Sequence, residues 1–430
     1  MDYKKKEFLS YNLHMIKTNK FKTTNVELLF SRDIKKEDIT ITNFLTSIMT
    51  YSTKKYNRRI KLSQKIEDLY AARLFSNCYR VGNQYIVDFT LKFLNDKYGE
   101  PGLFNGALDL LHEVVFSPNV ENGLFDEKTF DVVKIDEKNQ IERLLEDRRK
   151  YAGLKLFELT DPNAVFSINL KGYLDDLDKI TRANLYEYYK DFINCNKIDI
   201  FVIGDIDFDE VEKMITRKFI FKQKRVEDNF EVYDWSKKKK RKNEVIEYDN
   251  TNQAKLSISC RIDNITNYER NYVLSLYNII LGGSSDSKFF KNIREKFSLC
   301  YYISSSPQRM DNMLTISSGI TKENYSKAMI LINKEMNDMK KGNISNEEME
   351  KAKKFYLTSL EEVEDNPSQI INVYYSMDKF GLDDIEERKN IVSRITKEQI
   401  VELAKKISID TIFLLGGDKK WWNESLKILE

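Results

Sequence analysis

The chain repeats itself at an interval of half its own length, and this duplication constrains the fold more than any single motif. A helical pattern opened by Thr181 leads to the apolar segment 198–205, and a second one opened by Thr396 leads to the apolar segment 411–416. The two threonines are 396 − 181 = 215 positions apart in a chain of 430 residues. Threonine is favoured immediately before the first turn of a helix. We therefore expect two similar halves, each ending in a helix followed by a buried strand.

The order of the predicted elements favours an α+β fold for each half. Strand-like segments come in runs, and long amphipathic helices such as 346–363 separate these runs. Strict strand–helix alternation would indicate a doubly wound parallel sheet, whereas runs indicate a mixed or antiparallel sheet packed with helices. We expect a first domain at 1–222, a basic linker at 223–245 and a homologous second domain at 246–430.

The charge balance argues against a partner that is recognised by a global electric field. The 70 basic and 68 acidic residues nearly cancel and are interspersed, so neither nucleic acid nor a membrane surface is an expected partner. A basic run at 237–242 predicts nucleic-acid binding only weakly, and we interpret it as a solvated linker.

Cysteine usage and the N-terminus indicate a cytoplasmic protein. Cys78, Cys195, Cys260 and Cys300 are far apart and form no CxxC pair, which favours four buried, reduced thiols over disulfides or a thiolate metal site. No apolar run of signal-peptide length follows the lysine-rich start, and no stretch of about 18 apolar residues occurs.

The segment from Leu281 to Tyr302 carries the most specific pattern. It begins with Gly282-Gly283, continues through a small-residue loop and a helix containing Arg294-Glu295-Lys296, and ends in Leu-Cys-Tyr-Tyr. This order resembles the second-half signature of the insulinase/pitrilysin (inverzincin) family of zinc peptidases. The resemblance implies an insulinase-like half-clamshell of two α+β domains.

In that family the arginine and a tyrosine seven positions later bind the substrate backbone and the developing oxyanion at the zinc site of the opposing half. The resemblance assigns these roles to Arg294 and Tyr301, with Tyr302 as a substitute and Gly282 and Gly283 in the same substrate-binding segment. A guanidinium and a phenol are suitable donors for such an oxyanion. The alternative is that Arg294 pairs with Asp286 or Glu295 and the tyrosines fill the core.

The zinc motif of the family, His-x-x-Glu-His, falls here on Asn43, Thr46 and Ser47 as its degenerate positions. Neutral Asn, Thr and Ser are poor zinc ligands, and none of them is a carboxylate base. The resemblance puts the third zinc ligand near Glu137 or Glu142, which we interpret as surface carboxylates. We expect no metal in this chain.

The two histidines give no replacement site. His14 and His112 are far apart in sequence, and no second histidine follows His112-Glu113 at helical spacing. Each is therefore expected to be a packed or surface side chain.

Small members of the family act as pairs in which one chain keeps the zinc motif and the other keeps the Arg and Tyr. By this resemblance the chain is the non-catalytic subunit of a heterodimeric zinc metallopeptidase, inactive alone, with zinc in the partner and short or unfolded peptides as substrates. The alternative is a catalytically inert structural or peptide-binding protein with the same fold.

Overall fold

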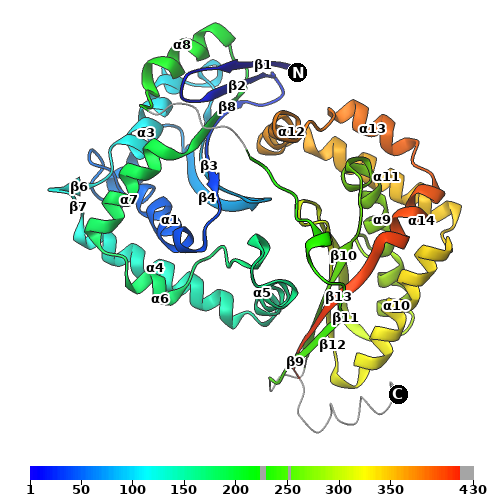
Figure 1. Ribbon diagram of the computed structural model, residues 1–430. Helices are drawn as coiled ribbons and strands as arrows, with labels where there is room; N and C mark the ends of the chain where they lie inside the picture. The colour runs from blue at the N-terminus through cyan, green and yellow to red at the C-terminus, as the bar shows by residue number, and fades with distance from the viewer. Residues whose placement is uncertain (223–228, 250–252, 417–430) are drawn as a thin grey trace. The chain divides into compact units, whose positions relative to one another are not determined.

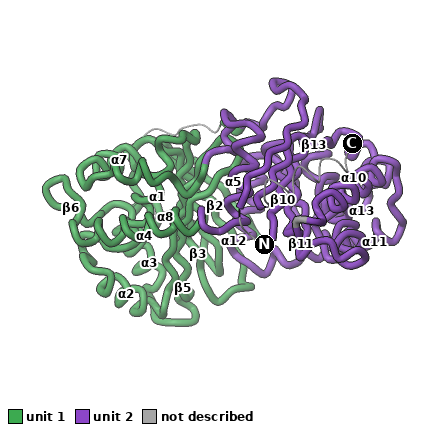
Figure 2. Tube along the Cα trace, turned by 90° about the horizontal axis from the view of Figure 1, so that it is seen from below, with its two compact units in different colours: residues 1–144, 169–230 green, residues 145–168, 231–430 purple. Residues whose placement is uncertain are grey.

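The computed structural model describes residues 1–222, 229–249 and 253–416, and it separates into two compact units (Figures 1 and 2). Unit 1 contains residues 1–144 and 169–230, and unit 2 contains residues 145–168 and 231–430. The division differs from the predicted boundaries in that 145–168, from the middle of the first half, belongs to unit 2. The chain therefore crosses between the units three times.

Unit 1 is built on a six-stranded mixed sheet in the order β1-β2-β8-β3-β5-β4. All neighbours are antiparallel except β2 and β8, which run parallel. The strands are β1 (Asp2–Glu7), β2 (Asn12–Lys17), β3 (Thr23–Asp33), β4 (Arg73–Val81), β5 (Gln84–Leu94) and β8 (Lys197–Gly204). A separate short hairpin joins β6 (Val120–Glu121) to β7 (Leu124–Phe125).

The helices of unit 1 bury one face of this sheet in a single apolar core. Alternate residues of β3, such as Val26, Leu28 and Phe30, share the core with Phe44 of α1 and Leu111 of α3, as the two-residue period of a strand requires. The helices are α1 (Lys36–Met49), α2 (Arg59–Glu67), α3 (Leu103–Phe116), α4 (Glu127–Glu146), α6 (Leu174–Asp178), α7 (Arg182–Cys195) and α8 (Phe208–Lys218).

Unit 2 contains a five-stranded sheet in the order β11-β12-β10-β13-β9. Only β13 and β9 are parallel neighbours. The strands are β9 (Asn243–Glu247), β10 (Ala254–Ile262), β11 (Cys300–Gln308), β12 (Met313–Ile320) and β13 (Ile407–Leu415). The helices are α5 (Arg148–Thr160), α9 (Leu274–Leu281), α10 (Tyr325–Lys341), α11 (Asn346–Val363), α12 (Pro367–Phe380), α13 (Ile385–Ser393) and α14 (Lys397–Lys406), with a π-helical segment η5 (Phe289–Glu295).

Both faces of the unit 2 sheet are covered (Figure 1). Ile412 and Leu414 of β13 face the large core that α9, α10 and α14 complete. Phe413 and Leu415 face the other way and pack against Ala152 and Leu156 of α5. Thr160 at the end of α5 also shares a hydrogen bond of 2.8 Å with Ser259 of β10. This two-sided burial explains why α5 belongs to unit 2.

The repeated helix starts are confirmed. Thr181 caps α7 and Thr396 caps α14, each accepting a hydrogen bond from the backbone N–H three residues on. The side-chain oxygens of Asn184 and Gln399 in turn accept hydrogen bonds from the backbone N–H groups of the capping threonines, which completes a capping box in both halves. A fully paired strand follows in each case, β8 in unit 1 and β13 in unit 2. The predicted pair of similar α+β halves is thus correct.

The predicted basic linker is mostly exposed where the structure describes it, but Trp235 and Lys238 are anchored to unit 2. Trp235 is 3% exposed, and its indole N–H donates to the carbonyl oxygens of Asp311 and Asn312. The Lys238 ammonium lies 2.8 Å from the carboxylate of buried Asp410. The interpretation of the whole run as solvated is therefore wrong for Lys238, because it compensates a buried charge in unit 2. Residues 223–228 of the predicted linker are outside the described part of the chain.

The prediction of four buried thiols is correct for Cys260 and Cys300 only. Cys78 is half-buried and Cys195, the last residue of α7, is exposed; all four are free thiols. Within the described residues, no helix is long and apolar enough to cross a membrane.

Candidate functional site

The degenerate zinc-motif positions lie on one buried face of α1. Asn43, Thr46 and Ser47 have the i, i+3, i+4 spacing that lines up side chains along a helix. Asn43 is 8% exposed and both ends of its amide are occupied. Its Oδ1 accepts from the Tyr85 hydroxyl at 2.8 Å, and its Nδ2 donates to the Leu170 carbonyl at 2.8 Å. Asn43 thus joins β5 and the segment before α6 to α1.

Thr46, at the position of the family's glutamate base, is bound to its own helix and to β4. Its hydroxyl donates to the Thr42 carbonyl at 2.7 Å and lies 3.5 Å from the Cys78 sulfur, which donates to it. Burial raises the pKa of the Cys78 thiol to about 11. The thiol is therefore neutral near pH 7, and the pair offers neither a base nor a thiolate ligand.

Ser47 binds the carboxylate of Glu137, which comes from α4. The Ser47 hydroxyl donates to Glu137 Oε1 at 2.5 Å, and the Gln140 amide donates to the same oxygen at 3.4 Å. Glu137 is 5% exposed, so its interpretation as a surface carboxylate is wrong. Burial raises the pKa of Glu137, against smaller lowering effects of the Ser47 hydrogen bond and of Lys171. Glu142 is half-exposed and forms a weak surface pair with Lys138 at 3.8 Å.

The donor set does not fit a zinc ion. A catalytic zinc site needs three strong ligands, typically two imidazoles and a carboxylate, with an activated water. Only Glu137 is a strong ligand here, and its neighbours on α1 are neutral groups whose hydrogen-bonding atoms are already used within unit 1. The site is an internal polar network, with no general base among Asn43, Thr46 and Ser47.

Both histidines are packed side chains, as predicted. His14 is fully buried in β2 (0% exposed), where its ring stacks on Phe201 at 4.1 Å and lies 3.2 Å from the Asp199 carboxylate. His112 in α3 packs against Phe116 at 4.8 Å. Desolvation lowers the pKa of His112. Neither histidine lies on α1.

Arg294 lies on the exposed side of η5 in unit 2. Its guanidinium stacks over the Phe290 ring at 4.7 Å, and no hydrogen bond or ion pair joins it to another described residue. Asp286, the acidic partner in the alternative interpretation, pairs with Lys291 at 2.7 Å and with Lys351 at 3.7 Å. The alternative pairing of Arg294 with Asp286 is therefore not seen, and the Arg294 side chain is exposed.

Tyr301 and Tyr302 occupy different environments at the start of β11. Cys300 pairs with Ile320 and Tyr302 with Gly319, so Tyr301 is the extra residue of a β-bulge. Its side chain is 61% exposed. Bulges of this kind turn a side chain away from the sheet and are frequent beside functional sites.

The Tyr302 ring is half-buried and lies near two cationic side chains. The Arg149 guanidinium of α5 lies 4.5 Å from its centroid and the Lys255 ammonium of β10 lies 6.0 Å away. Desolvation raises the pKa of the Tyr302 hydroxyl. The structure thus gives the two tyrosines different surroundings, with only Tyr301 projecting freely.

The glycine pair positions the loop before η5 against β11. The Gly282 carbonyl accepts from the Ser305 N–H at 3.0 Å, and a Cβ on Gly282 would come within 2.6 Å of Phe289 and 2.7 Å of the Ser305 hydroxyl. A Cβ on Gly283 would likewise come too close to the Asn278 side chain. Gly282 therefore allows close packing against η5 and β11, the two elements that carry Arg294 and Tyr301.

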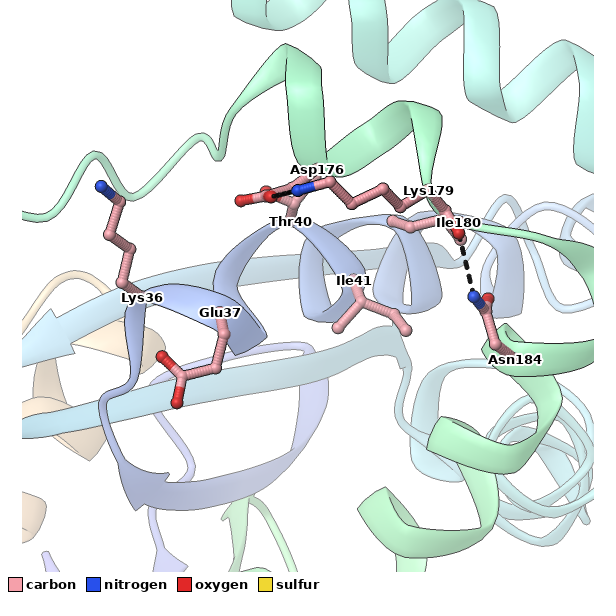
Figure 3. A pocket seen from close by; sticks show the side chains of 8 residues that line it. All are labelled: Lys36, Glu37, Thr40, Ile41, Asp176, Lys179, Ile180 and Asn184. Atoms are coloured by element: carbon pink, nitrogen blue, oxygen red, sulfur yellow. Dashed lines mark hydrogen bonds and ion pairs between the residues drawn. The ribbon is translucent and has the colours of Figure 1, made fainter.

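A separate surface cavity of about 500 Å³ lies over the first turns of α1 in unit 1 (Figure 3). Ile41 and Ile180 provide apolar lining, and Asp176 and Lys179 pair with each other at 2.8 Å. Asn184 donates to the Lys179 carbonyl at 3.0 Å. The degenerate motif positions do not line this cavity.

Sequence reasoning does not identify the residues that bind the degenerate positions of α1. It assigns Glu137 to the surface and predicts no contact with α1 for Tyr85 or Cys78. Only Glu137 has a sequence signal that indicates a site residue, because the resemblance puts the family's third zinc ligand in its segment. No local pattern identifies Tyr85 or Cys78, because they lie in β5 and β4, which are distant from α1 in sequence.

The fold agrees with comparisons to known proteins. A family model described as "Peptidase M16 inactive domain" matches residues 179–356. The chain is therefore similar to insulinase-like proteins of the M16 peptidase family, and in particular to members described as inactive.

Individual relatives support the same assignment. The chain is 28% identical over 411 residues to the "Probable inactive metalloprotease YmfF" of Bacillus subtilis (strain 168), covering 94% of this chain and 95% of that protein. A conserved protein from Enterococcus faecalis V583 has a similar structure, with a TM-score of 0.89, 27% identity and coverage of 97% and 99%. A "peptidase M16 inactive domain" from Pseudomonas fluorescens shares the fold, with a TM-score of 0.77, 16% identity and coverage of 97% and 99%.

Proposed function

We propose that this chain is the non-catalytic subunit of a heterodimeric zinc metallopeptidase that acts on peptides. The observation that carries the proposal is a contrast between the two units. The metal position in unit 1 is closed by internal hydrogen bonds such as Ser47 to Glu137, whereas Arg294 and Tyr301 in unit 2 are exposed. A chain that has lost its metal chemistry but keeps exposed donors is suited to complete another chain's site.

The chemistry of the two side chains supports this role. A guanidinium carries a fixed positive charge and five N–H donors, and a phenol donates one O–H. Donors held near a scissile carbonyl stabilise the negative charge that develops on its oxygen during hydrolysis. Arg294 would also bind the substrate backbone, and Tyr301 would donate to the oxyanion. Zinc and the base that activates water would come from the partner subunit.

The expected substrates are short or unfolded peptides. Such peptides bind by adding a strand to a sheet edge, which gives affinity through main-chain hydrogen bonds and little side-chain selectivity. We also propose a cytoplasmic location, which the four free cysteines support.

The test is a peptidase assay with a mixed fluorogenic peptide library. The purified chain is assayed alone and then with an M16 protein that has an intact His-x-x-Glu-His motif and is encoded in the same genome. We expect no cleavage by the chain alone and a rise in cleavage when it is added to the partner. Arg294→Ala should lower the turnover of the pair on the order of tenfold to thousandfold, as expected for loss of an oxyanion donor.

Lys296→Ala is the matched control, because it removes a neighbouring exposed cation whose ammonium lies over the Phe297 ring. It should leave turnover within about twofold, since exposed single charges contribute little. Equal losses in both variants would indicate a general charge effect. If the chain binds the partner or peptides but never changes turnover, the inert structural or peptide-binding alternative replaces the proposal.

A further inference from the structure

Three strands of the unit 2 sheet place Lys255, Gly319 and Tyr302 in one row. Lys255 of β10 is paired with Gly319 of β12, and Gly319 is paired in turn with Tyr302 of β11. Residues that are directly paired across strands share one face of a sheet. The row continues from Lys255 to Leu415 of β13, which packs against α5. These side chains therefore lie on the face of the sheet that α5 covers.

The glycine in the middle of this row leaves space that the Tyr302 ring occupies. A Cβ on Gly319 would come within 2.5 Å of the ring atom Cε1. The Arg149 guanidinium of α5 lies 4.5 Å from the centroid of the same ring, and the Lys255 ammonium lies 6.0 Å from it. Arg149 is one turn before Ala152, so it continues the stripe of α5 that faces this sheet. Two positive charges from separate elements therefore lie beside one aromatic ring.

These two charges have no acidic partner in unit 2. Arg149 is exposed and Lys255 is half-buried, and no carboxylate among the described residues forms an ion pair with either. The Lys255 ammonium donates to the neutral side chain of Gln253, and desolvation lowers the pKa of this lysine. Asp147 instead caps α5, accepting from the backbone N–H groups of Arg149 and Lys150, and pairs with the Lys150 ammonium at 3.5 Å. An added anion would therefore find both cations unpaired.

We propose that Arg149 and Lys255 bind a carboxylate of the peptide substrate beside Tyr302, either an acidic side chain or the C-terminal carboxylate. A guanidinium over an aromatic ring keeps its N–H donors at its edge, where a carboxylate accepts two of them. An ammonium has three donors, and Gln253 takes one of those of Lys255. Tyr302 directly follows Tyr301, so the carboxylate would lie next to the proposed oxyanion donors. The inference rests on the proposed function for its choice of peptides as ligands.

Fluorescence anisotropy of labelled peptides with the full chain tests the site. The parent peptide contains only uncharged residues and ends in a carboxamide. One derivative has a free C-terminal carboxylate, and another has Asp in place of a central Asn. At constant ionic strength we expect at least one derivative to bind about tenfold or more tightly than the parent, as expected for hydrogen bonds to a charged group. The derivative that gains affinity identifies the source of the carboxylate.

Substitution of the two cations should remove this preference. Arg149→Gln combined with Lys255→Gln should bring all three peptides to the same affinity within about twofold. Arg149→Lys keeps the charge but loses the paired donors, so it should retain only part of the preference. It provides a second variant if the double substitution prevents folding. Lys150→Gln is the matched control, because it removes an exposed cation of the same helix, and it should leave the preference unchanged.

Equal affinities of the unmodified chain for all three peptides would overturn the proposal, and so would a preference that survives the double substitution. These outcomes are separate from the test of the proposed function. If the chain prefers a carboxylate but never raises the turnover of the partner, the subunit function is wrong and the site stands. If turnover rises without any carboxylate preference, the function stands and the site is wrong.

Discussion

Ser47 donates a hydrogen bond to Glu137 across 2.5 Å and so links α1 to α4. Glu137 is buried and its pKa is raised by that burial. The serine hydroxyl therefore satisfies a buried carboxyl and provides an internal structural contact between the two helices.

Loss of this contact should destabilise the chain. Ser47→Ala leaves a buried carboxyl without its closest donor, which costs about 1–3 kcal/mol of unfolding free energy. Chemical denaturation followed by circular dichroism measures the change. Ser393→Ala is the control, because its exposed hydroxyl bonds only a carbonyl of its own helix. An unchanged unfolding midpoint for Ser47→Ala would show that the bond contributes nothing.

Histidines at the degenerate positions should restore a metal site. Asn43→His and Ser47→His together have the i, i+4 spacing of zinc-binding histidines, and Glu137 supplies the carboxylate ligand. We expect about one zinc per chain in the double variant by mass spectrometry of the metal, and far less than one in the unmodified protein. Adding Glu137→Gln should remove most of the gained zinc. Stoichiometric zinc in the unmodified chain would contradict our account of the site.

Alanine substitutions of Gly282, which precedes η5, and of Gly153, within α5, should change stability in opposite directions. Gly282→Ala forces a methyl group toward Phe289 and Ser305, which should cost about 1–3 kcal/mol. Gly153→Ala in α5 meets nothing within 4 Å, so it should stabilise the chain by about 0.5–1 kcal/mol through better helix propensity. Thermal unfolding of both variants checks the contrast, and a neutral Gly282→Ala would refute tight packing there.

A carboxyl of the unit 1 sheet should make stability depend on pH. Burial, with a further contribution from Glu27, raises the pKa of Asp88 to about 8. The folded state then keeps a proton that the unfolded state loses near pH 4, so stability falls as pH rises between about 4 and 8. Asp88→Asn should flatten this part of the stability profile. The same slope in both proteins would assign the dependence to another group.

Substitutions of Tyr301 and Tyr302 should differ in their effect on stability. Tyr301→Phe removes a hydroxyl from a side chain that is 61% exposed, so unfolding free energy should change by less than about 0.5 kcal/mol. Tyr302→Ala removes a half-buried ring that contacts Arg149 and Lys255, at a cost of about 1–3 kcal/mol. Urea denaturation distinguishes the two. A large loss for Tyr301→Phe would mean that its hydroxyl is structural.

Much of the fold was predictable because it depends on local signals. The capping threonines Thr181 and Thr396, and the apolar strands that follow, are readable from neighbouring residues alone. The loss of the zinc motif is also visible in the sequence, because Asn43 and Ser47 stand where the family has histidines. These inferences need only residue identity and short spacing.

The remaining features depend on contacts between distant segments. Glu137 lies on a charged helix and resembles a surface residue until Ser47, 90 positions earlier, is placed beside it. Likewise, Ala152 and Leu156 give α5 an apolar stripe, but the sequence does not reveal that its partners are Phe413 and Leu415. Periodicity identifies a buried face without identifying what covers it.

The location of α5 also affects how the chain is made. A ribosome completes this helix well before β10 and β13, the strands it covers, have been synthesised. The apolar stripe of α5 must therefore stay exposed until the second half emerges, and the first half cannot finish folding as an independent product. A gene split between the repeated halves would separate α5 from its sheet, so the duplicated sequence no longer corresponds to two separable proteins.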